Sequence, residues 1–137
     1  MRLGPRATAL KTTIIGARSP HSHPNEHIKR IQLKYERILD IGCGNGRHFI
    51  FPLTIGIDAD PRILKQAKIR GMCIYGDGQN LPIRDNVFDL ALFCYSLEYM
   101  KDPDKARDEG KRVAEDSFEL IYPAYYSWDR VYPSARM

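Results

Sequence analysis

The chain has 137 residues, of which 43% are hydrophobic and 28% are charged, and its formal net charge is +4. These values exclude a disordered polyelectrolyte and predict one compact core with little chain left for a second domain. No apolar run approaches the roughly 20 residues of a membrane-spanning helix, and the N-terminus lacks a secretory leader pattern, so we expect a soluble, cytoplasmic protein. Three cysteines without metal-ligand spacing predict reduced, mostly buried thiols.

The positive charge is concentrated at the beginning of the chain. Residues 1–37 contain eight Lys or Arg and two acidic residues, a net charge of +6. Pro and Gly predict an irregular arm over residues 1–24, with one short strand near Thr12 to Ile15, followed by a single domain over 25–137. Such an arm contacts RNA in some proteins and is only solvated surface in others. His21, His23 and His27 have no Cys or acidic cluster beside them, so we predict no metal site.

Alternating apolar and polar segments follow the arm. From Asn25, the spacing of Ile28, Ile31 and Tyr35 predicts a short amphipathic helix. Two further helices are expected, each with an Asp before a Pro in its first turn, over Pro61 to Arg70 and Pro103 to Ala114. Five apolar runs are expected to be buried strands, over Ile38 to Ile41, Leu53 to Ile57, Met72 to Tyr75, Phe88 to Cys94 and Phe118 to Tyr122. This order predicts an α/β protein with a parallel sheet and right-handed crossovers.

The first strand runs directly into three alternate glycines, Gly42, Gly44 and Gly46. Because glycine permits positive φ and has no Cβ, such a loop lets main-chain amides approach a nucleotide cofactor, although it can also be a tight turn. Dinucleotide-binding loops have their third glycine one position later, where this chain has Arg47. The spacing therefore disfavours NAD.

The second strand ends at Asp58, in the sequence Gly-Ile-Asp-Ala-Asp. A carboxylate at this place can accept hydrogen bonds from both ribose hydroxyls of a nucleotide. The alternative, that Asp58 caps the following helix, is weaker because Asp60 stands immediately before Pro61.

The segments LDIGCGNG and GDGQNLPIRDNVFDLALF resemble the motifs of the class I S-adenosylmethionine-dependent methyltransferase superfamily, type 11-like. CGNG followed by LPIRDNVFD is also similar, more weakly, to tRNA wobble-uridine methyltransferases. The resemblance covers about two thirds of the chain. It implies a Rossmann-like, doubly wound sheet with strand order 3-2-1-4-5, S-adenosylmethionine as cofactor, and methyl transfer to a small molecule or RNA.

The same resemblance implies roles for particular residues. The glycine loop, with Cys43, cradles the methionine half of the cofactor, and Asp40 faces its ammonium group directly or through water. Asp58, with Ala59 beside it, binds the ribose, whereas Asp77 and the amide of Gly78 bind adenine. Four residues after the fourth strand are expected to face the methyl group, with Glu98 or Tyr95 contacting the acceptor: Cys94, Tyr95, Ser96 and Glu98.

The chain also departs from that family. About ten residues separate Gly46 from Gly56, which leaves room only for a very short first crossover helix, and no Pro-Gly-Gly turn precedes the fifth strand. The chain ends where the family normally adds a helix and an antiparallel hairpin, so we expect a C-terminally truncated fold with an open fifth strand. We expect the aromatic tail from Tyr122, anchored by Trp128, to cover that edge in a homodimer or against a partner. A cofactor-binding subunit that needs a partner chain for activity is the alternative to a self-sufficient enzyme.

Overall fold

The computed structural model describes residues 12–15, 26–50 and 53–121, and of residues 12–15 and 26–27 it describes only the backbone. Three α-helices lie in this part of the chain, α1 (Glu26–Gln32), α2 (Pro61–Arg70) and α3 (Pro103–Val113), with one short 3-10 helix, η1 (Leu97–Tyr99). The strands are β1 (Thr12–Ile15), β2 (Ile38–Ile41), β3 (Thr54–Asp58), β4 (Met72–Tyr75), β5 (Phe88–Cys94) and β6 (Ala114–Ile121). None of the described helices is long and apolar enough to cross a membrane.

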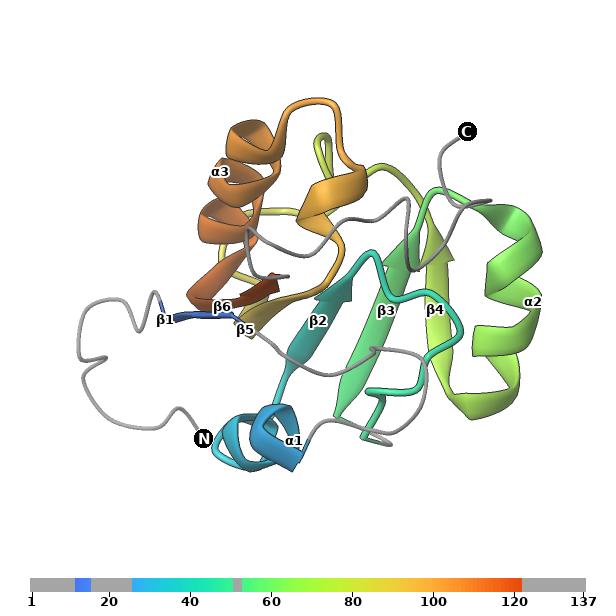
Figure 1. Cartoon of the computed structure of the whole chain (residues 1–137), viewed down its shortest axis with the longest axis horizontal. Helices are drawn as coiled ribbons and strands as arrows, with labels where there is room; N and C mark the ends of the chain where they lie inside the picture. The colour runs from blue at the N-terminus through green and yellow to red at the C-terminus, as the bar shows by residue number, and fades with distance from the viewer. Residues whose placement is uncertain (1–11, 16–25, 51–52, 122–137) are drawn as a thin grey trace.

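The strands form one parallel sheet in the order β1-β6-β5-β2-β3-β4. Without β1, this is the predicted order 3-2-1-4-5, so the fold class is confirmed. The order reverses between β2 and β5, which are adjacent although β3 and β4 lie between them in sequence (Figure 1). In an open parallel sheet, ligands bind beyond the carboxyl ends of the strands at such a reversal.

The outer edge of β6 is not open, which corrects the prediction of an unpaired fifth strand. β1 pairs with β6 in parallel, from Thr12 opposite Phe118 to Ile15 opposite Ile121. The short strand expected near Thr12 is therefore present, and it supplies the backbone partner that an edge strand otherwise lacks. The tail with Trp128 lies outside the described residues, so its role in an interface stays a prediction.

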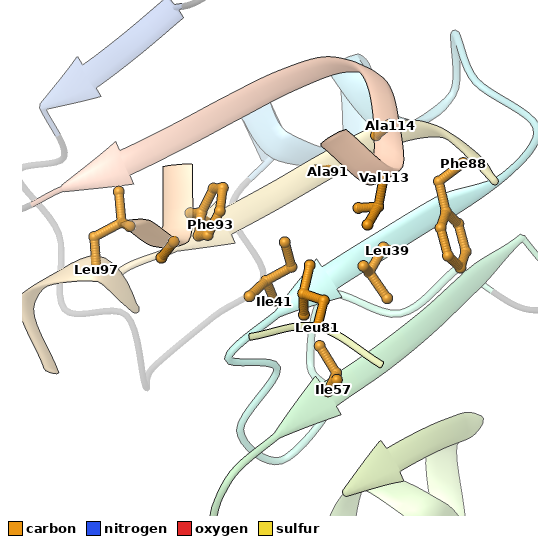
Figure 2. Packing of buried hydrophobic residues seen from close by; sticks show 11 residues of the cluster. Leu39, Ile41, Ile57, Leu81, Phe88, Ala91, Phe93, Leu97, Val113 and Ala114 are labelled. Carbon is orange, nitrogen blue, oxygen red and sulfur yellow. The ribbon is translucent and has the colours of Figure 1, made fainter. Parts of the chain in front are cut away.

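Helix α3 covers one face of the sheet. Apolar side chains of β2, β3 and β5 point toward α3, η1 and the loop before β5, and they form the largest described core (Figure 2). Its labelled members are Leu39, Ile41, Ile57, Leu81, Phe88, Ala91, Phe93, Leu97, Val113 and Ala114.

Helices α1 and α2 lie on the opposite face. Asp40 of β2 pairs in register with Gly56 of β3, which pairs with Cys73 of β4, so the three residues share a face. Cys73 packs against the buried Leu64 and Ala67 of α2. On the same face Ile38, two residues before Asp40, packs against Ile28 of α1.

The two longer helices begin where their sequences predict. Asp60 accepts a hydrogen bond from the amide of Arg62, and Asp102 accepts one from the amide of Lys105, so each caps its helix before a Pro in the first turn. Asp58 is not the cap of α2.

The connection from β2 to β3 contains no helix in the residues that the structure describes. The chain turns at residues 42–48, and the half-buried ring of Phe49 packs over Gly46, Gly56 and Gly71. The expected very short crossover helix is thus replaced by an aromatic ring, which fills the space over β3 that a helix would occupy.

The last strand begins four residues earlier than predicted, at Ala114 instead of Phe118, directly after α3. Its residues alternate strictly between buried and half-buried, and the polar Asp116 takes a buried position. Asp116 is held there by the hydroxyl of Tyr35, which donates a hydrogen bond to its Oδ2 (3.0 Å). The sequence hides this start because a buried carboxylate interrupts the apolar alternation.

Candidate functional site

A cavity of about 700 Å³ lies beyond the carboxyl ends of β2, β3, β4 and β5. Its walls come from the ends of β2, β3 and β5 and the loops that follow these four strands, together with the first turn of α2 and the end of η1. It therefore occupies the place where the strand order reverses, where the doubly wound fold positions a ligand.

Nine of the ten residues predicted to bind the cofactor line this cavity: Asp40, Gly42, Cys43, Gly44, Asp58, Ala59, Asp77, Gly78 and Cys94. The tenth, Gly46, is buried and does not line it. A Cβ at Gly46 would lie 2.9 Å from the ring of Phe49, so this glycine makes room for packing.

Asp40 is the most unusual polar group of the cavity. Its side chain is 1% exposed, and neither carboxylate oxygen has a hydrogen-bond partner in the described structure. Burial raises its pKa from 3.8 to about 7, with Arg47 opposing that rise and Asp58 adding to it. A buried carboxylate without a partner is costly, so its position is suited to a cationic or hydrogen-bond-donating ligand.

The glycine loop turns sharply after β2. Gly42 and Gly44 have φ values of +73° and +57°, which other L-residues rarely adopt. A Cβ on Gly42 would lie 2.4 Å from the Cβ of Ser96, whereas one on Gly44 would meet nothing within 4 Å. The backbone at Gly44 is thus open to a ligand, while Gly42 allows the loop to pack against the end of β5.

Asp58 connects this loop to the start of α2. Its Oδ2 accepts a hydrogen bond from the amide of Gly44 and its Oδ1 one from the amide of Asp60, both at 2.9 Å. The carboxylate remains half-buried in the cavity wall. Since an ionised carboxylate offers about four acceptor positions, Asp58 keeps capacity for further donors such as hydroxyl groups.

Asp77 and Gly78 form a turn after β4. The Oδ1 atom of Asp77 accepts hydrogen bonds from the amide and the side-chain nitrogen of Gln79, at 2.9 and 3.1 Å. Gly78 is buried, and a Cβ there would lie 2.7 Å from Ile41 and 2.9 Å from Met100. The turn is therefore held closely against the end of β2.

The residues after β5 form the remaining wall. Tyr95 is buried with a positive φ of 55°, a strained conformation for an aromatic residue, and Ser96 donates a hydrogen bond to the carbonyl of Ile41 (2.7 Å). Of the residues predicted to face the methyl group, Tyr95 and Ser96 line the cavity, whereas Glu98 is exposed and does not. Tyr99 and Met100, which the sequence analysis missed, line it instead.

Comparison with known proteins agrees with this geometry. The family model "Methyltransferase domain" matches residues 39–118. The chain belongs to this methyltransferase family.

Individual relatives and structures resemble parts of this methyltransferase domain. An uncharacterized protein of Methanocaldococcus jannaschii, MJ1123, is 37% identical over 87 residues, which are 62% of this chain and 42% of that protein. A SAM-dependent methyltransferase of Thermotoga maritima has a similar structure (TM-score 0.60, 28% identity, 65% of this chain and 44% of that one). The complex of the Trm112 methyltransferase activator with a methyltransferase from Haloferax volcanii shares the fold (TM-score 0.61, 21% identity, 69% and 48%). The chain thus spans less than half the length of these proteins.

Two adjoining residues of the methyltransferase cavity, Arg47 and His48, were not predicted as ligand-binding. Nε of Arg47 donates to Nε2 of His48 (3.1 Å), and burial with the neighbouring Arg47 lowers the pKa of His48 to about 3. The side chain of Gln32 in α1 donates to the carbonyl of His48 and ties the loop to that helix. From the sequence, Arg47 served only to disfavour dinucleotide binding. Its position next to the glycine loop was the available signal.

Proposed function

We infer that this domain binds S-adenosylmethionine in the cavity and transfers its methyl group to an acceptor. Membership of the methyltransferase family supports the reaction class. The observation that carries the proposal is Asp40, a buried carboxylate without a partner at the end of the strand that leads into the glycine loop. The ammonium group of the cofactor, directly or through water, would supply the positive charge and the donors that Asp40 lacks.

The other cavity residues fit the remaining parts of the cofactor. Asp58 has acceptor positions for the ribose hydroxyls. In the turn after β4, Asp77 and the amide of Gly78 would bind adenine. Cys43, Ala59 and Cys94 form part of the cavity wall. When bound, the cofactor supplies an electrophilic methyl group on a sulfonium.

The acceptor side is formed by residues after β5. Tyr95, Ser96, Tyr99 and Met100 line the cavity there and carry hydroxyl or apolar groups. Such a wall would orient an acceptor and exclude water, and positioning alone can supply much of the rate of a displacement reaction. The proposed acceptor is a small molecule or RNA.

An alternative is that the domain binds the cofactor but needs a partner chain for activity. Two observations favour it: the β2–β3 connection has no helix among its described residues, and the fold is shared with the complex of a methyltransferase and its Trm112 activator. Methylation by the isolated chain, with labelled cofactor and total RNA, protein and metabolite fractions, would exclude this alternative. A stoichiometric second chain in a pull-down from the native cell would support it.

Calorimetry tests the proposal. The folded protein should bind S-adenosylmethionine and its demethylated product, and Asp58→Ala should weaken binding tenfold or more because a hydroxyl-binding charged group is lost. Asp108→Ala is the matched control, since Asp108 is an exposed aspartate of α3 away from the cavity. Absence of binding heat from folded protein at several temperatures would refute the proposal.

A further inference from the structure

The two helices on the α1 and α2 face are much more basic than α3. Together α1 and α2 contain six Lys or Arg and one acidic residue, a net charge of +5, whereas α3 contains four basic and three acidic residues, a net charge of +1. Helix α2 alone has four basic residues and no acidic one. Among the described helices, the excess positive charge therefore lies on the α1 and α2 face.

The basic residues of α2 point to solvent. Leu64 and Ala67 bury one side of the helix against β3 and β4, and all four basic residues are exposed. Arg62 forms an ion pair with Asp60, but no ion pair within the described part of the chain involves the other three, Lys65, Lys68 and Arg70. We call Lys65, Lys68 and Arg70 the basic face of α2.

The arginines of α3 are used differently. Arg107 forms ion pairs with Asp104 and Glu119, and Arg112 forms them with Asp85 and Glu109. Their charge is thus balanced within the fold, while that of the basic face of α2 is available to a ligand.

An exposed aromatic residue lies beside this helix. Strand β4 packs against α2 at the edge of the sheet (Figure 1). Tyr75 ends this strand and is 66% exposed. Cys73, two residues earlier, packs against α2, so the alternation of a strand places Tyr75 on the same face. The next residues, Gly76 and Asp77, line the cavity.

This basic surface is continuous with the mouth of the cavity. Arg62, in the first turn of α2, lines the cavity, and the basic face continues from it along a helix of about 15 Å. S-adenosylmethionine has no phosphate group, so binding the proposed cofactor does not account for these charges.

We propose that the basic face of α2 and Tyr75 bind single-stranded nucleic acid, with the phosphate backbone along α2 and a base stacked on Tyr75. Exposed cations along a helix beside an exposed aromatic ring are a combination that binds single strands, because phosphates need positive charge and unpaired bases need a stacking surface. An acidic protein would use the cations but not the ring in this way. The further idea that the bound strand also carries the methyl acceptor rests on the proposed function. The binding of the strand does not depend on the proposed function.

Fluorescence anisotropy with labelled oligouridylate tests the surface. The triple variant Lys65→Glu, Lys68→Glu, Arg70→Glu should bind roughly tenfold more weakly or worse than the wild type. The slope of log affinity against log salt should become less steep by about 2, since each single-strand phosphate contact contributes roughly 0.7. Tyr75→Ala should weaken binding without changing that slope, because stacking releases no counterions.

The matched control reverses three exposed lysines near or in α3, Lys101→Glu, Lys105→Glu and Lys111→Glu, which changes the net charge equally. It should retain most of the affinity. Equal losses in the two triple variants would overturn the proposal in favour of a general charge effect, and absence of oligouridylate binding by the wild type would refute it outright. Displacement of the strand by polyglutamate at equal charge concentration would assign the surface to an acidic protein.

Two further measurements separate this inference from the proposed function. Oligothymidylate in place of oligouridylate distinguishes DNA from RNA as the source of the strand. Calorimetry with S-adenosylmethionine should give the same affinity for the α2 triple variant as for the wild type, which also shows that the variant is folded. Strand binding without cofactor binding would refute the proposed function alone, and cofactor binding without strand binding would refute this inference alone.

Discussion

The ring of Phe49 occupies the space directly above Gly56, where a Cβ would lie 2.3 Å from Cζ of the ring. This contact replaces a helix in the β2–β3 crossover of the described structure, and it also limits what β3 tolerates. The Sγ atom of Cys43, in the glycine loop, would lie 2.7 Å from the same Cβ. Packing over β3 is therefore coupled to the loop that forms the cavity.

Gly56→Ala should destabilise the domain because either the ring or the loop must move. We expect a loss of about 1–3 kcal/mol in the free energy of unfolding, measured by urea denaturation. In a Phe49→Leu background the same substitution should cost less, since the smaller side chain leaves room. Equal costs in the two backgrounds would contradict the coupling between Phe49 and Gly56.

Asp40→Asn should weaken cofactor binding and remove its pH dependence. Because the pKa of Asp40 is about 7 in the free protein, a cationic ligand must displace a proton below that pH. Wild-type affinity should therefore fall as pH decreases from 7.5 to 5.5, by up to about tenfold per unit, in calorimetric titrations. The variant should bind weakly with a flat profile.

Asp116→Asn is the control for this measurement, because Asp116 is also a buried aspartate but lies away from the cavity. Its pH profile of binding should match that of the wild type. A steep profile retained in Asp40→Asn would assign the titration to another group.

The stability of the cofactor-free protein should depend on Asp40 in the opposite sense. Its folded pKa, about 7, lies above the ordinary value of 3.8, so the folded state binds a proton that the unfolded state releases. Stability from this group is present below about pH 4 and is lost as pH rises through 7, by about 4 kcal/mol at most. Thermal melts should show that Asp40→Asn loses less stability than the wild type between pH 5 and 8. An unchanged difference between them would contradict this assignment.

Arg112 should hold the segment before β5 onto α3. Its guanidinium donates to the carbonyls of Leu81 (3.1 Å) and Ile83 (2.7 Å) and pairs with Asp85 and Glu109. Arg112→Met should lower the melting temperature and increase hydrogen exchange over residues 81–86, because two carbonyls lose their donor. Lys111→Met, at the adjacent exposed position, should change neither.

Strand β1 should protect the sheet from self-association. Deletion of residues 1–15 would leave the outer edge of β6 unpaired, and we expect concentration-dependent oligomers in light scattering. Deletion of residues 1–11 retains β1 and should behave as the full chain. A monomeric 1–15 deletion variant at all concentrations would show that β1 is not needed to block the edge.

Most of the fold follows from local patterns. The bounds of β2, β4, β5 and α2 were predicted to the residue, since short apolar runs and an Asp-Pro start are local signals. The place of the cavity also follows from the sequence: nine of the ten proposed residues line it, because they lie at or directly after the carboxyl ends of parallel strands, and these ends meet at one edge.

Tertiary structure decided the remainder, which depends on partners distant in sequence. Asp116 can occupy a buried strand position because the hydroxyl of Tyr35 donates to its Oδ2, and β1 pairs where it does because the edge of β6 accepts a parallel partner. Burial decided the state of Asp40, since its raised pKa comes from lost hydration that no residue pattern reports. The sequence alone determined which residues meet at the cavity, and the packing around Asp40 determined the protonation of that residue.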